Sequence, residues 1–266
     1  MASDPANPAK KAAKAPREVP AWKPAPEAKA QSTRLRLIAL VLWVVAIALE
    51  AVAIFWVLRP PFEQLAAAHG FPQWRWWLLL GFIVVIGVLS VVGSQLWKKA
   101  NHLDPASSKE PIRFFVQNQL GAIIALIAFV PLIIMIFLNK DMNGQQKGIA
   151  GAVGIVVALV AVFAGIDFKP LSSEQSAVES QVVTHLVGQD LVWWSEGGNV
   201  VHLCQNASDL QNVKTPVQSG TIETALGQRK EGITLELRSE LTQCGLPVPD
   251  DIDEVVAWVR QARGAA

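Results

Sequence analysis

His202, Cys204 and Cys244 are the residues whose types could bind a metal ion or change redox state. His202 and Cys204 lie two positions apart in a run of β-type residues, and side chains at that spacing on a strand face the same side. The pair could therefore meet either a metal ion or Cys244. A tetrahedral zinc site needs four ligands, with any thiols deprotonated, so zinc would need a further ligand from a carboxylate or His185. Three interpretations are open: residues without a ligand, a metal site, and a disulfide or redox pair.

Glu50 is the one ionisable residue inside a long apolar run. A carboxyl group in hydrocarbon is costly and faces a helix interface or water. Pro131 lies at a similar depth in another apolar run, and its ring leaves the carbonyl of Ile127 without its helical hydrogen bond. We predict that protonated Glu50 donates to backbone at this proline. A structural acid, a proton or ion relay, and contact with an accessory subunit are the alternatives.

Gln117, Asn118 and Gln119 form a polar triplet where the run containing Pro131 begins. With Asn101 and His102, they are expected at the cytoplasmic interface, where amides bond to headgroups, loop backbone or water. A binding pocket there is the alternative interpretation.

Four apolar runs are long enough to cross a bilayer, which requires about 20 residues. They cover residues 37–58, 77–97, 117–138 and 149–166. The sequence therefore predicts an α-helical membrane bundle of four transmembrane helices over residues 34–168. A basic tail, residues 1–33, precedes it and is rich in Ala, Pro and Lys, a composition typical of disorder.

Residues 170–266 are predicted to form a small soluble α+β domain. Two β-type runs around Glu196-Gly197-Gly198 indicate a hairpin. Ser172 and Gln175 have capping-box spacing at the start of a helix. Three more helices are expected over residues 221–229, from Ile233 to a stop at Gly245, and after Asp250 or Asp251.

The distribution of charge predicts which side of the membrane each part occupies. Twelve Lys and Arg lie in the tail and the second loop, against four in the first and third loops. Basic loops stay cytoplasmic, so both termini are expected in the cytoplasm of a multi-pass cell-membrane protein. That location argues against a stable disulfide, whereas the disulfide would be the leading interpretation if the domain lay outside. Residues 167–266 carry 7 basic and 14 acidic side chains, which argues against nucleic acid as a partner because phosphate contacts need a basic surface.

The segment from Leu96 to Gly151 resembles a bacterial family of four-span membrane proteins of uncharacterised function. The resemblance implies fold and location, and no activity. It also implies a C-terminal hairpin module similar to the metal-binding modules of DNA-repair methyltransferases, and His202 matches the histidine of that module. Val201 replaces its tyrosine, Ala207 stands five residues after His202, and Cys204 is out of register. Only Cys244 remains of the closing cysteine pair, so the resemblance implies a degenerate module.

These features predict a membrane protein that is not an enzyme and presents an acidic interaction or sensing domain to the cytoplasm. One alternative is a transporter or accessory subunit that uses Glu50. Another is a thiol-redox or metal sensor that uses Cys204, Cys244 and His202, with zinc as the candidate metal and no other cofactor. The expected partners are the lipid bilayer and another membrane protein or a second copy of the chain.

Overall fold

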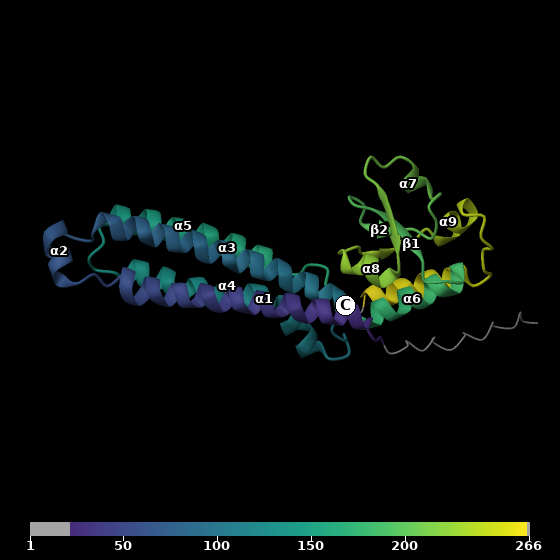
Figure 1. Ribbon diagram of the computed structural model, residues 1–266, viewed down its shortest axis with the longest axis horizontal. Helices are drawn as coiled ribbons and strands as arrows, with labels where there is room; N and C mark the ends of the chain where they lie inside the picture. The colour runs from purple at the N-terminus through teal and green to yellow at the C-terminus, as the bar shows by residue number, and fades with distance from the viewer. Residues whose placement is uncertain (1–21, 265–266) are drawn as a thin grey trace, which may run out of the picture.

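The computed structural model describes residues 22–264, which form a long helix bundle with a small mixed domain at one end (Figure 1). Four helices are long and apolar enough to cross a membrane, by length and composition. Each contains most of one predicted span. Their bounds are α1 Pro26–Val52 with the π-helix η1 Ala53–Val57, α3 Gln73–Leu103, α4 Pro111–Leu138 and α5 Gly144–Gly165. The short helix α2, Phe62–Ala68, lies at the end of the bundle away from the domain.

Small residues let the four helices approach closely. A Cβ atom added to Gly93 of α3 would lie 2.6 Å from Nε1 of Trp43 in α1. One added to Gly165 would overlap the backbone of Gly121 and Ala122, so α5 and α4 touch through their main chains there. Larger side chains at these two glycines would push the helices apart near the domain.

The far end of α1 is fixed by tertiary contacts that local sequence does not reveal. The π-helix closes with a hydrogen bond from the Leu58 N–H to the Ala53 carbonyl. The Arg75 guanidinium donates to the carbonyls of Trp56 and Val57 and lies 5.0 Å from the Trp56 ring centroid. The Asn139 amide donates to the Leu58 carbonyl at 2.8 Å. These donors satisfy carbonyls that the last turn of a helix leaves free.

The helical part of the N-terminal segment begins earlier than predicted. Residues 26–33, expected in the disordered tail, are the first turns of α1, with Pro26 at a position that a helix tolerates well. The Ala25 N–H donates to the Glu223 carboxylate of the domain at 2.8 Å, and Ser32 is buried. Docking on the domain therefore extends the helix beyond the apolar run. Residues 1–21 of the predicted tail lie outside the described residues.

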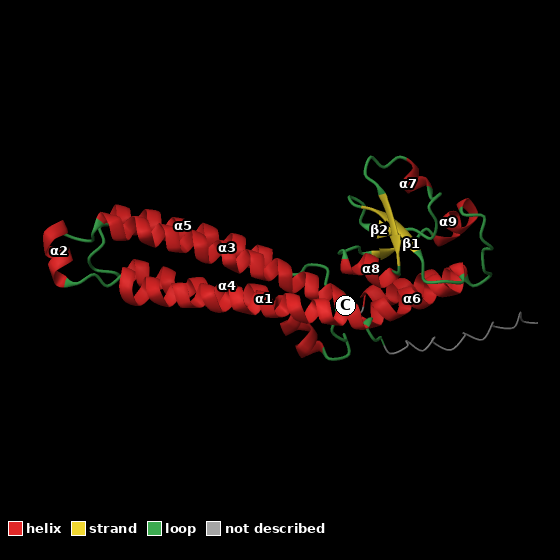
Figure 2. Ribbon diagram, in the orientation of Figure 1, coloured by secondary structure: helices red, strands yellow, loops and turns green. Residues whose placement is uncertain are grey.

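The C-terminal domain packs helices around two small two-stranded sheets (Figure 2). Its core is aliphatic with one large aromatic side chain, Trp194. The predicted helices are present, with Ser172 and Thr221 as N-caps and Gly245 in a left-handed conformation. The predicted start of one is wrong: Ile233 belongs to strand β4, because it pairs with Val201 of β2, and the helix α9 begins only at Leu237. The bounds are α6 Ser173–Val187, β1 Val192–Ser195, β2 Val200–Val201, α7 Ser208–Gln211, β3 Val217–Gly220, α8 Ile222–Gly227, β4 Gly232–Ile233, α9 Leu237–Gln243 and α10 Ile252–Gly264.

The predicted hairpin forms only in part. β1 and the run that contains β2 are joined by one antiparallel bridge, Trp193 with His202. The main partner of β1 is β3, antiparallel, and β2 pairs in parallel with β4. The Lys230 ammonium donates to the carbonyls of Ser195, Glu196 and Gly198, so it holds the turn from inside. Contacts distant in sequence therefore determine how these strands pair.

Candidate functional site

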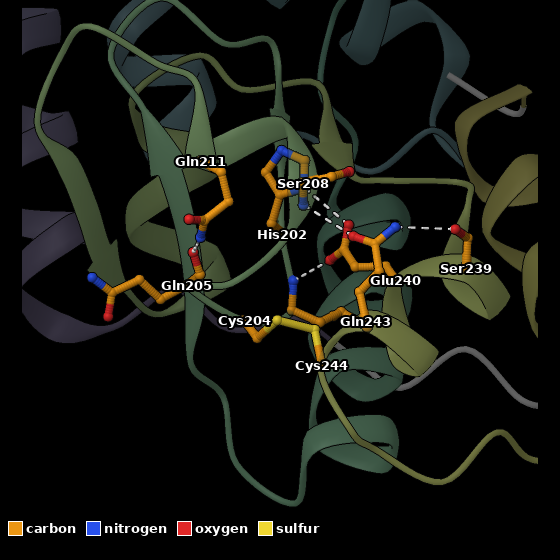
Figure 3. The surroundings of a disulfide bond; sticks show 10 residues. His202, Cys204, Gln205, Ser208, Gln211, Ser239, Glu240, Gln243 and Cys244 are labelled. Carbon is orange, nitrogen blue, oxygen red and sulfur yellow. Dashed lines mark hydrogen bonds and ion pairs between the residues drawn. A yellow bond between two sulfur atoms is a disulfide. The ribbon is translucent and has the colours of Figure 1, made fainter.

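Cys204 and Cys244 form a disulfide on the domain (Figure 3). Cys204 follows β2 and Cys244 is the C-cap of α9, and their Cα atoms are 5.9 Å apart across a sequence separation of 40. Of the three interpretations that the sequence leaves open, the structure selects the covalent pair. Both residues are partly exposed, so a soluble thiol or an enzyme could reach the bond.

His202 and Glu240 form a buried polar pair beside the disulfide. The Nδ1 atom of His202 lies 2.9 Å from Oε2 of Glu240, and the Leu203 N–H donates to Oε1 of the same carboxylate. Glu240 belongs to α9, four residues before Cys244, so the carboxylate and the disulfide hold the same helix against the same strand. Figure 3 shows both links converging on the segment from His202 to Cys204.

A metal site at His202, Cys204 and Cys244, one of the three interpretations that the sequence leaves open, is incompatible with the disulfide. Disulfide sulfurs carry no thiolate charge, and thiolate is the form that binds zinc. One nitrogen of His202 is occupied by Glu240. Within residues 22–264, no group of three or more His, Cys, Asp or Glu side chains is placed to hold a metal ion.

The ion pair between buried Glu179 and partly exposed Arg263 is a second link that the sequence does not reveal. The Glu179 carboxylate accepts from Arg263 Nε at 2.9 Å, Gln175 Nε2 at 3.0 Å and the Ile233 N–H at 2.9 Å. It joins α6, α10 and β4, which lie up to 84 residues apart. The acidic residue sits among polar residues of an ordinary amphipathic pattern, so no local signal marks it as buried.

Glu50 lies where the sequence predicts, next to the proline turn of α4. The side chain is 5% exposed and interacts with the backbone of Leu132, one residue after Pro131. The backbone group that it meets therefore differs from the predicted Ile127 carbonyl. Its Oε1 atom is buried without a hydrogen-bond partner. The setting is a packed contact between α1 and α4.

The triplet Gln117, Asn118 and Gln119 serves contacts within the protein. The Gln117 carbonyl accepts from Trp97 Nε1 at 2.7 Å and from Asn101 Nδ2 at 2.9 Å. Gln119 Nε2 donates to the carbonyl of Asp167 at 3.1 Å, which confirms the predicted bonding to loop backbone. These amides fix α4 to α3 and to the linker between α5 and α6.

The domain is attached to the bundle through that same end. Glu174 of α6 accepts from Ser107 Oγ at 2.5 Å, from the Ser108 N–H at 2.9 Å and from Ser108 Oγ at 3.0 Å. His102 Nδ1 lies 3.3 Å from the Leu226 carbonyl of α8. The loop between α3 and α4 is therefore the site at which the domain docks on the bundle.

Comparisons with family models, curated proteins and solved structures found no match to this chain.

Proposed function

We propose that this chain is a multi-pass cell-membrane protein that holds its acidic domain at the cytoplasmic face and acts as a sensing or interaction module. The observation that carries the proposal is the seating of the domain on the α3–α4 loop through Glu174, Ser107 and Ser108. A domain tied to the bundle in this way can pass a change in its own conformation to the membrane helices. No catalytic role is assigned to any residue.

Thiol-redox sensing is the form of sensing that a specific observation favours. Cytosolic disulfides are usually transient and redox-active, so a partly exposed Cys204–Cys244 bond in the cytoplasm fits a sensor. A dithiol reductant would give two electrons and two protons to the bond, leaving two thiols and becoming a disulfide itself. The Glu240 contacts and the packing of Leu203 with Leu237 and Leu241 in the core would then hold α9 to the His202 segment.

A chain of contacts connects the disulfide to the bundle. The His202–Cys204 segment continues from β2, and β2 pairs with β4. The residues that enter β4 include Arg229, whose guanidinium donates to Gln95 of α3 at 3.1 Å. A displacement of β2 can therefore change the position of α3 through β4 and Arg229.

Transport through Glu50 is supported less well. A relay needs water or a series of ionisable groups, and Glu50 lies in a packed contact. An accessory-subunit role for the same residue would need its face of α1 to be free, whereas that face packs on α4.

Hydrogen–deuterium exchange of the full-length protein in detergent tests the sensing proposal. Reduction of the disulfide should increase exchange in residues 202–204 and 237–244, and also in the α3–α4 loop, 104–110. The Cys204→Ser/Cys244→Ser double variant is the matched control, because it should resemble the reduced protein and ignore the reductant. A response confined to α9 and the His202 segment would overturn the proposal of transmission.

A further inference from the structure

A cavity of about 510 Å³ lies where the bundle meets the domain. Its walls come from α3, from the linker 166–171, from α6, from the loop before β4 and from α10. α8, which precedes that loop, lies beside the end of the bundle (Figure 1). The cavity is thus at the level where the apolar spans end and the polar domain begins.

The cavity is cationic although the domain around it is acidic. Four of the seven basic residues in residues 167–266 line it: Lys169, Arg229, Lys230 and Arg263. Lys98 of α3 is a fifth, whereas Asp167 and Glu231 are the acidic residues in the lining. The concentration of positive charge at this one place therefore needs an explanation other than composition.

Several of these cations have neutral hydrogen-bond acceptors. Lys98 donates to the Ile166 carbonyl, and Arg229 donates to the side-chain oxygen of Gln95. Lys230 donates to three backbone carbonyls. Lys169 pairs with Glu231 at 2.6 Å and Arg263 with Glu179. The ion pairs leave an excess of positive charge that an anion would neutralise.

Arg229 is held at the cavity by an uncommon backbone conformation. Its φ is 67°, in the left-handed region that residues other than glycine seldom adopt. The side chain is exposed and reaches Gln95 on α3. The turn therefore directs a guanidinium to the junction, a group suited to binding phosphate oxygens in pairs.

One wall of the cavity is apolar and continues toward the spans. Ile166 and Phe168 follow the end of α5, and the Phe168 ring is 70% exposed. Phe163, in the last turn of α5, is 62% exposed. A ligand with an anionic head and a hydrocarbon tail would match both parts of this surface.

We propose that this cavity binds the phosphodiester headgroup of an anionic phospholipid, with Arg229 and Lys169 contacting the phosphate and the acyl chains lying along Phe168 and α5. The inference relies on the proposed membrane position of the bundle, and it is independent of redox sensing and of which leaflet the domain faces. A bound lipid would join α3, the linker and the domain at the point where Arg229 meets Gln95.

Binding of short-chain lipids to the full-length protein in a neutral detergent tests the proposal. Dihexanoyl phosphatidylglycerol should bind saturably, and dihexanoyl phosphatidylcholine should bind at least about five-fold more weakly, since one charge near a surface phosphate contributes about that factor. Inorganic phosphate and glycerol 3-phosphate should compete poorly, because they lack the acyl chains. Competition by inorganic phosphate at equal concentration would assign the cavity to a free anion and overturn the lipid proposal.

Charge variants locate the binding. Arg229→Gln and Lys169→Gln should each weaken phosphatidylglycerol binding about five-fold. Arg260→Gln removes an equal charge from an exposed position on α10 and is the matched control. Thermal unfolding without lipid establishes that each variant is folded. Unchanged affinity in both cavity variants, or an equal loss in Arg260→Gln, would overturn the proposal.

Discussion

Glu50 is a carboxyl group held inside the bundle by packing. Glu50 is 5% exposed, and one of its carboxyl oxygens has no hydrogen-bond partner. The carboxyl group lies against the backbone of Leu132. A charged acid in this place would need a compensating charge, whereas a neutral acid costs much less free energy to bury. The structural interpretation of this residue therefore agrees with its surroundings.

Replacing Glu50 distinguishes the structural role from transport. Glu50→Gln should change the free energy of unfolding by no more than about 1 kcal/mol, because the amide keeps the shape and a neutral polar group. Glu50→Ala should cost about 2 kcal/mol or more, because it leaves a cavity. Thermal unfolding in detergent measures both, with Glu63→Gln on α2 as the control. A loss for Glu50→Gln as large as for Glu50→Ala would show that the carboxyl group itself is required.

For individual residues, the sequence could identify candidates for function, but it could not choose among their roles. These candidates are Glu50, His202, Cys204 and Cys244. The choice depends on distances across the fold. Cys204 and Cys244 come within 5.9 Å because α9 packs on the segment after β2. Glu240, which fixes that packing, resembles any exposed acid of a short helix when only sequence is considered.

The helix α6 is the element that attaches the domain to the bundle. Its first turn presents Glu174 to Ser107 and Ser108, and the Ser173 N–H donates to the Ala106 carbonyl at 3.0 Å. Partial burial alone would raise the pKa of Glu174, but the hydrogen bonds from Ser107 and Ser108 outweigh it and lower the pKa below 4.5. The ionised carboxylate is therefore the form that holds the loop.

Stability should depend on pH through Glu174. A carboxyl group with a lowered pKa in the folded state stabilises above the unfolded pKa, and the contribution is lost as pH falls through the folded pKa. Glu174→Gln should therefore be less stable than wild type at pH 7, with the difference shrinking below about pH 4.5. Chemical denaturation between pH 3 and 7 measures this, with Glu254→Gln on α10 as the control. A difference independent of pH would contradict the assignment.

Helical periodicity and capping residues predict most elements because their causes are local. The start of α6 at Ser172 and the stop of α9 at Gly245 are examples. The π-helix at Ala53–Val57 and the pairing of β2 with β4 escape prediction because distant residues cause them. Arg75 and Asn139 donate to carbonyls at the end of the π-helix. Lys230 holds the turn between β1 and β2 and so positions β2 for pairing with β4.

At the scale of the whole molecule, the domain, the start of α1 and the α3–α4 loop lie at one end of the bundle. Four helices that all cross a membrane would require this arrangement, and the eight basic residues within residues 22–36 and 98–113 belong to the same end. The positive-inside rule then favours the cytoplasm for the domain. The disulfide introduces a conflict, since stable disulfides belong mostly to oxidising compartments. Either the bond is reversible or the orientation is opposite.

Cysteine labelling in intact cells resolves this conflict. In the Cys204→Ser/Cys244→Ser background, Ala67→Cys on α2 should react with a membrane-impermeant maleimide, and Ser208→Cys on the domain should react only after permeabilisation. A C-terminal fluorescent-protein fusion that folds only in the cytoplasm gives an independent measurement on the otherwise unaltered chain. The reverse pattern would place the domain outside, make the disulfide a structural bond and remove redox sensing as a function. The lipid cavity would remain, because its charge and its apolar wall suit an anionic headgroup in either leaflet.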